Sequence, residues 1–160
     1  MHPSVQELEI LARQVNQAHR SAVQAELNAV GLGEVGHPLL LTILQGSCVQ
    51  DPEGQCHAQR DLAQLLHISP AAVATSLKSL EKSGYIRREP GRDARRNRVI
   101  LTEKGQEAVT GCQNAFTAVS QRMLSGFSPE EREQLLSFRR RMLHNLREGS
   151  PSPTQAKEEC

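Results

Sequence analysis

Arginine is concentrated in one short segment near the middle of the chain, where its chemistry suits phosphate binding. Six of the twelve residues from position 87 to position 98 are arginine. Residues 58–104 carry ten Lys and Arg against five Asp and Glu, a net charge of +5, whereas the whole chain has a net charge of only +1. The positive charge is therefore gathered on one segment, as in proteins that meet phosphates. The expected phosphate contacts are Arg87, Arg88, Arg92 and Arg96, with Lys78 from the segment before them.

A second surface suited to binding precedes the arginines. Ser69 is a good helix N-cap and Pro70 suits the first helical position, so a helix is expected to begin here. Its apolar side is expected at Val73, Leu77 and Leu80. The opposite face has small and hydroxyl side chains, which let a helix backbone approach DNA closely. These residues are Ala71, Ala72, Thr75, Ser76, Lys78 and Ser79.

A particular order of elements is needed to position these two surfaces. The pattern predicts a helix, a tight turn, a second helix and a two-stranded hairpin, which is the order of a winged helix-turn-helix. Such a device puts one helix in the DNA major groove and a charged loop beside it. An ordinary solvated hairpin is the alternative, and the preceding helix-turn-helix makes it the less favoured one. In the first helix, Leu62, Leu65 and Leu66 repeat at helical spacing and are expected to form one apolar stripe. The other expected features are a break at His67 to Ser69, a second helix ending at Gly84, strands at Tyr85-Ile86 and Val99–Leu101, and a turn at Pro90-Gly91.

The same segment resembles the MarR family of bacterial transcription regulators. The matching stretches are DLAQLLHISPAAVATSLKSLEKSGYIRR and RDARRNRVILTEKG. In that family the wing carries Asp-x-Arg, here Asp93-Ala94-Arg95, several residues before a Val-x-Leu-Thr-x-x-Gly segment, here Val99 to Gly105. The resemblance is specific in the central third of the chain and looser over residues 4–147.

The resemblance implies how the site residues act. Arg95 would enter the minor groove, where narrow A·T-rich stretches concentrate negative potential, and Asp93 would orient it. The helix face from Ser69 to Ser79 would read bases, with Ser69, Thr75 and Lys78 as the preferred contacts. Ala94 departs from the family, because many relatives place a second basic residue there. Arg92 and Arg96 could compensate.

Long amphipathic segments flank the winged segment. Residues 4–30 read as one helix roughly 40 Å long, more than a compact monomer of this size would cover. Residues 39–45 are expected to form a short helix with little polar surface, which places it at the centre of the fold. Residues 102–125 are expected to form a longer helix, and Ser128-Pro129 to start the last one, with Glu131 as the acid of a capping box. The flanking helices resemble the family's dimerisation region, and a dimer would read two half-sites about 34 Å apart. The expected divisions are 1–36 (dimerisation), 37–104 (DNA-binding lobe), 105–147 (dimerisation) and 148–160 (disordered tail).

Composition narrows the function classes. The fold class expected is mainly α with a small β wing, in a chain of 160 residues with 38% hydrophobic content. Three Phe, one Tyr and no Trp argue against a stacking platform for single-stranded nucleic acid. No leader and no membrane-spanning apolar run is apparent, so a cytoplasmic protein without membrane partners is expected.

The cysteines and histidines leave several readings open. Cys48 and Cys56 are separated by seven residues, which is not the usual C-x₂₋₄-C spacing of a zinc site. No metal or other cofactor is expected, and a redox switch through either cysteine and ordinary thiols remain alternatives. Relatives often bind a small phenolic or aromatic ligand between the dimer helices and the DNA-binding lobe. The residues that could face such an effector are His19, His37 and Cys112, each also readable as a plain packed or surface residue.

The expected function is that of a homodimeric, sequence-specific regulator of transcription that binds double-stranded DNA. A repressor that responds to a ligand or to oxidation is the favoured form, and an activator is the alternative within this reading. A protein-interaction module that kept the fold without binding DNA is the rival. An enzyme is not expected, because no nucleophile–base pair, phosphate-binding glycine loop or carboxylate pair stands at a useful spacing.

Overall fold

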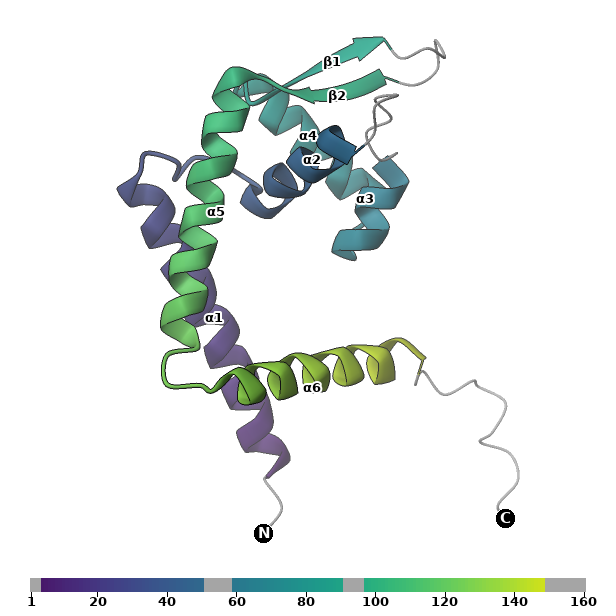
Figure 1. Cartoon of the computed structure of the whole chain (residues 1–160). Coiled ribbons are helices and arrows are strands. Elements are labelled where there is room, and N and C mark those ends of the chain that lie inside the picture. Colours follow the sequence, from purple (N-terminus) through teal and green to yellow (C-terminus); the bar gives the residue numbers. More distant parts are fainter. Residues whose placement is uncertain (1–3, 51–58, 91–96, 149–160) are drawn as a thin grey trace, which may run out of the picture. The chain divides into compact units, whose positions relative to one another are not determined.

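A computed structural model describes residues 4–50, 59–90 and 97–148, and in these the protein is mainly helical with one small sheet (Figure 1). The predicted fold class, a winged helix-turn-helix that is mainly α, is confirmed. Five predicted site residues lie outside the described residues: Cys56, Arg92, Asp93, Arg95 and Arg96. The side chain of Cys48 and the expected tail, beyond its first residue, lie outside them too. The elements are α1 Val5–Ala29, α2 Pro38–Gln50, α3 Gln59–Leu66, α4 Pro70–Lys82, β1 Ile86–Pro90, β2 Asn97–Leu101, α5 Glu103–Met123 and α6 Pro129–Glu148.

The chain divides into two compact units, residues 1–120 and residues 121–160. The first unit contains α1 to α4, the two strands and α5 as far as Ser120. The second begins with the end of α5 and contains α6. Among the described helices none is both long and apolar enough to cross a membrane.

The core of the first unit is built around α2. Leu40, Leu41 and Leu44 have no exposed surface, which fits the central place expected of this apolar helix. Each such leucine contributes about 1.5–3 kcal/mol relative to an exposed one. The helix includes residues as far as Gln50, beyond the expected end at Gln45. The other fully buried side chains include Leu27, Leu62, Val73, Leu80, Ile86, Val109 and Cys112.

Helix α3 buries a different stripe from the one expected. Leu62 is 1% exposed and Ala63 is 5% exposed, whereas Leu65 is 62% exposed. At 100° per residue, Leu62, Ala63 and the half-buried Leu66 occupy one arc of about 100°, and Leu65 lies outside it. Assigning Leu65 to the apolar stripe was therefore wrong.

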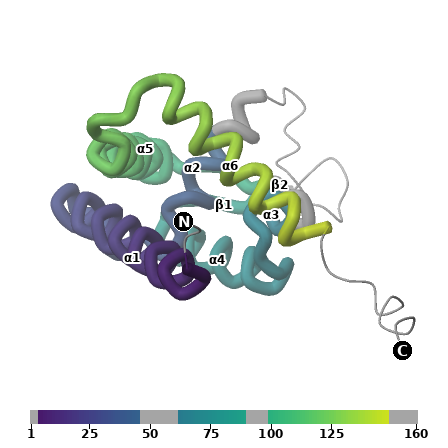
Figure 2. The backbone as a smooth tube through the Cα atoms, turned by 90° about the horizontal axis from the view of Figure 1, so that it is seen from below, coloured from purple at the N-terminus to yellow at the C-terminus, as the bar shows by residue number. Residues whose placement is uncertain are grey.

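The wing is an antiparallel pair, β1 with β2, in which Arg88 is opposite Val99 and Ile86 is opposite Leu101. Figure 1 shows the wing beside the first turn of α5. A Cβ at Gly105 would overlap the backbone carbonyl oxygen of Tyr85, so only glycine permits this close approach. Farther along, α5 runs beside α1 (Figure 2), and Gly111 faces the side chain of Leu32 just beyond α1.

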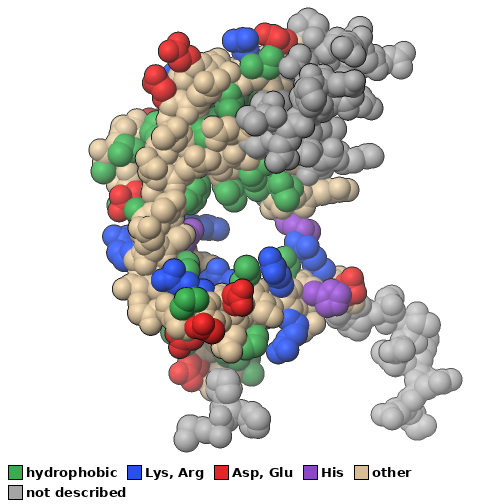
Figure 3. Space-filling model, viewed as in Figure 1, with side chains coloured by type: hydrophobic (Ala, Val, Ile, Leu, Met, Phe, Trp, Pro, Cys, Tyr) green, Lys and Arg blue, Asp and Glu red, His purple; other side chains and the backbone are tan. Residues whose placement is uncertain are grey.

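The second unit begins α6 with the predicted capping box. Glu131 N donates to Ser128 Oγ at 3.2 Å, and Ser128 N donates to Glu131 Oε2 at 2.8 Å. Hydrogen bonds from its own backbone amide and from Ser128 lower the pKa of Glu130. None of the described side chains of α6 is buried. Figure 3 shows charged side chains along this helix, and its exposed apolar residues include Leu136, Phe138, Met142 and Leu143.

Candidate nucleic-acid interface

Helix α4 presents the predicted binding face to solvent. Its buried side consists of Val73, Leu77 and Leu80, each at most 3% exposed. All eight predicted contact residues on the helix or its cap are exposed or half-buried: Ser69, Pro70, Ala71, Ala72, Thr75, Ser76, Lys78 and Ser79. The predicted division of the helix into an apolar and a small polar face therefore matches its burial.

Two of the preferred contact hydroxyls also bond the helix itself. Ser69 Oγ accepts from Ala72 N at 3.1 Å as the N-cap, which leaves its own proton to donate. Thr75 Oγ1 donates to Ala71 O at 3.0 Å, which leaves its oxygen lone pairs to accept. The Ser69 hydroxyl can therefore donate a hydrogen bond to a ligand, and the Thr75 hydroxyl can accept one from it.

The turn between α3 and α4 contains an unusual residue conformation. His67 has φ 52° and is the only described residue other than glycine with a positive φ. His67 N donates to Gln64 O at 3.4 Å, and Ile68 N donates to Ala63 O at 3.2 Å. This pair of bonds is a Schellman motif, in which glycine is the usual residue. Sequence reasoning identified the break here but not the left-handed residue that makes it.

The arginines at the base of the wing are already engaged in ion pairs. Arg87 Nε is 2.9 Å from Glu89 Oε1 on the same strand, and both side chains are well exposed. Arg88 Nε is 3.4 Å from Glu81 Oε2 of α4, and its side chain is 29% exposed. Because the Arg88 Nε is buried and has no hydrogen-bond partner in the described structure, its link to Glu81 is electrostatic. Arg88 therefore connects the wing to the helix as well as carrying charge.

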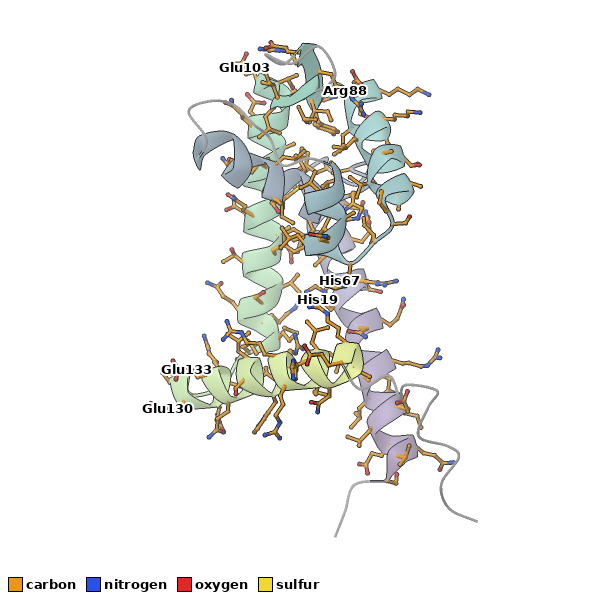
Figure 4. The ribbon with its side chains drawn as sticks, turned by 90° about the vertical axis from the view of Figure 1, so that its right-hand side faces the viewer. His19, His67, Arg88, Glu103, Glu130 and Glu133 are labelled. Carbon is orange, nitrogen blue, oxygen red and sulfur yellow. The ribbon has the colours of Figure 1, made fainter. Side chains whose placement is uncertain are left out.

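The wing arginine and the helix turn lie at different ends of the helix-turn-helix. Figure 4 shows Arg88 and Glu103 at the wing end of the first unit, and His67 at the far end of α4. The interface candidates are therefore spread along α4 and onto the hairpin, as an elongated ligand would require. The wing tip itself, with Arg92, Asp93, Arg95 and Arg96, falls in the part that is not described.

The candidate effector residues have ordinary structural roles. Cys112 has no exposed surface, and burial raises the pKa of its thiol above the ordinary value of 9.0. His37 Nδ1 accepts from Leu40 N at 3.3 Å and so caps α2, while His19 is half-buried on α1. In the described ranges, no group of three or more His, Cys, Asp and Glu residues is arranged to hold a metal ion.

Comparison with known proteins agrees with this geometry. A family model described as the MarR family matches residues 51–96, which include α3, α4 and β1. In this segment the chain is similar to MarR-family proteins. A relative, the uncharacterized HTH-type transcriptional regulator YdgJ of Bacillus subtilis (strain 168), is 34% identical over 90 residues. That match covers 56% of this chain and 55% of YdgJ, so the chain spans about half the length of this relative.

Two solved structures extend the likeness in fold over most of the chain. The S. aureus MepR–DNA complex aligns with a TM-score of 0.72 at 24% identity, over 89% of this chain and 96% of MepR. CouR from Rhodococcus jostii RHA1, bound to p-coumaroyl-CoA, aligns with a TM-score of 0.65 at 20% identity, over 91% of this chain and 94% of CouR. At these identities the likeness concerns the fold, which here includes the terminal helices as well as the winged segment.

Proposed function

We propose that this chain is a sequence-specific regulator of transcription of the MarR family, which binds double-stranded DNA and represses by occupying a promoter. The observation that carries the proposal is the exposed small-residue face of α4, which is joined to an arginine-rich wing by the Glu81–Arg88 ion pair. The fold shared with MepR in its DNA complex supports a duplex as the partner.

Each part of the interface has a proposed role within the lobe of residues 37–104. The α4 face from Ser69 to Ser79 reads base edges in the major groove. Arg95 enters the minor groove, with Asp93 orienting it. Phosphates are neutralised by Arg87, Arg88, Arg92, Arg96 and Lys78, which makes affinity depend on salt.

The acting form is a homodimer, with residues 1–36 and 105–147 as the dimerisation region. Exposed apolar side chains on α1 and on α6 support a dimer. On α1, Val5, Leu8 and Leu11 are at least 50% exposed, and on α6 Phe138 and Met142 are 51% and 62% exposed. Covering this apolar surface with a second copy stabilises the assembly. Sedimentation equilibrium that returns only the mass of one chain at micromolar concentration would contradict the dimer.

A small molecule or oxidation is proposed to control DNA binding. CouR is bound to p-coumaroyl-CoA, which supports a small-molecule effector for this chain too. Such a ligand, or oxidation at Cys48 or Cys56, would favour a dimer whose two DNA-binding lobes no longer match the half-site spacing. A thermal-shift screen of aromatic acids and their thioesters, followed by DNA release with each hit, tests the ligand form.

The DNA partner itself is tested by selecting bound duplexes from a random-sequence library with the full chain. We expect a pseudopalindromic sequence with half-sites about one helical turn apart. Affinity for the selected duplex should fall steeply between about 50 and 200 mM salt, because several phosphates are neutralised. Failure to enrich any duplex sequence would instead favour a protein-interaction module with a winged-helix fold.

A further inference from the structure

The three peptide carbonyls that follow α4 all accept hydrogen bonds from Thr102, which directly precedes α5, or from Lys104 in its first turn. Lys104 Nζ donates to Ser83 O at 2.6 Å. Thr102 Oγ1 donates to Gly84 O at 2.6 Å, and Thr102 N donates to Tyr85 O at 3.1 Å. We name these three bonds the latch. Carbonyls at a helix end commonly bond to water. Here all three bond to Thr102 and Lys104 instead, so the end of α4 is specifically connected to the start of α5.

Thr102 acts on both helices with one hydroxyl group. Its oxygen accepts from Gly105 N at 3.0 Å, which caps α5, while its proton is donated to Gly84 O beyond the end of α4. The start of α5 and the end of α4 are therefore held by the same atom. A valine at this position would keep the shape of the side chain and lose both bonds.

Lys104 is held in place from a second direction. Its ammonium lies 4.6 Å from the centroid of the Tyr85 ring, which is itself buried. Gly105, the next residue, brings the first turn of α5 against the Tyr85 backbone. Figure 4 shows Glu103, which lies between the two latch residues in sequence, at the same end of the unit as Arg88. These contacts favour a structural role for the Lys104 ammonium group over a role in binding phosphate.

We propose that Thr102 and Lys104 are positioning residues that fix the angle between α4 and α5, and so set the half-site spacing that the protein accepts. The inference rests on the proposed DNA-binding dimer. From Glu103 to Ser120, α5 extends roughly 27 Å, so a tilt of about 5° at the latch moves its far end by roughly 2 Å. That is more than half of the ~3.4 Å rise of one base pair. Small changes at the latch thus matter on the scale of DNA register.

The test compares duplexes that differ only in spacing. The full chain binds its selected duplex and the same half-sites with one base pair inserted or removed between them. Thr102→Val and Lys104→Met should reduce the preference for the native spacing at least about threefold, since lost hydrogen bonds let the angle vary. Thr102→Ser keeps the hydroxyl and should keep the wild-type preference. Lys82→Met is the matched control, because it removes an equal charge from an exposed side chain in the last turn of α4.

The spacing preference distinguishes a positioning role from a general loss of stability, because a loss of stability would lower the affinity for all spacings equally. Retention of the wild-type preference in both latch variants overturns the inference. Lys104→Met could instead keep the spacing preference and reduce the salt dependence of DNA binding by the equivalent of about one phosphate contact. That result would make Lys104 a phosphate contact and overturn its positioning role. Lys104 is exposed, so this variant folds even where Thr102→Val does not.

Amide hydrogen exchange in the DNA-free chain tests the latch independently of the proposed function. Gly84 N and Tyr85 N close α4 by bonding Glu81 O and Leu80 O, and Gly31 N and Leu32 N close α1 in the same way. Lys104→Met should speed exchange at the α4 pair about fivefold and leave the α1 pair unchanged. Equal rates at the α4 pair in variant and wild type would overturn the latch even if no duplex is bound. Absence of DNA binding with faster α4 exchange would overturn the proposed function and the spacing role, and would leave only the latch.

Discussion

Arg88 in β1 pairs with Glu81 in α4, with Nε 3.4 Å from Oε2, so one ion pair joins the wing to the helix beside it. The neighbouring Arg87 pairs within its own strand, to Glu89. Two adjacent arginines of the same hairpin therefore serve different structural purposes. Arg87→Met and Arg88→Met each remove one positive charge, and this makes them a matched pair of variants.

We predict that Arg88→Met lowers the free energy of unfolding by about 0.5 kcal/mol more than Arg87→Met does, because only Arg88 links two elements. Urea unfolding of both variants measures the difference. A double-mutant cycle with Glu81→Gln isolates the pair. A coupling energy of zero in that cycle would remove the ion pair as a connection between wing and helix.

Arg95→Ala should weaken binding to the selected duplex by about 1–3 kcal/mol while leaving the dimer intact. In the proposed complex this change removes a guanidinium from a narrow, electronegative minor groove. Fluorescence anisotropy gives the affinity and sedimentation gives the assembly. Wild-type affinity at physiological salt would exclude Arg95 from the interface.

His67→Gly should stabilise the protein by about 0.5–1 kcal/mol, since a φ of 52° strains a side chain with a Cβ and costs glycine nothing. His67→Val should destabilise it, because branching at Cβ makes the left-handed conformation worse. Both changes should appear as shifts of the urea midpoint with an unchanged slope. A glycine variant less stable than wild type would mean that the imidazole compensates for the backbone strain.

The buried thiol of Cys112 should make the free energy of unfolding depend on pH in the alkaline range. Burial raises its pKa in the folded chain above the ordinary 9.0, so the unfolded chain loses this proton first as pH rises. The stabilising contribution is present below pH 9.0 and is lost as pH rises through the higher folded value. Unfolding of wild type and Cys112→Ala across pH 8 to about 10.5 measures it. Identical pH profiles for the two proteins would refute the shift.

The winged helix-turn-helix was predictable because its signals are local. Ser69 and Pro70 determine where α4 begins, Gly84 with φ 81° determines where it ends, and the reciprocal bonds of Ser128 and Glu131 start α6 as expected. The alternation of small polar and apolar residues along α4 likewise predicted which side would be buried.

The remaining features depend on contacts between residues distant in sequence. The latch joins Lys104 to Ser83 across 21 positions, and the same positive charge reads equally well as a phosphate contact. Arg88 looked like any other wing arginine until its partner on α4 was known. Leu65 was misassigned because the burial of one short helix depends on where its neighbours pack, which periodicity alone does not determine.

The arrangement of α4 also bears on which substitutions its solvent-facing side can accept. Its fold is secured by Val73, Leu77 and Leu80, which solvent does not reach, whereas Ser76, Lys78 and Ser79 make no contribution to the hydrophobic core. Exchanges at outward positions of this kind typically alter stability by no more than about 0.5 kcal/mol. If this face reads DNA as proposed, a duplicated gene can gain a different target sequence through a few substitutions on the outer face of one helix, while the packing beneath it is unchanged.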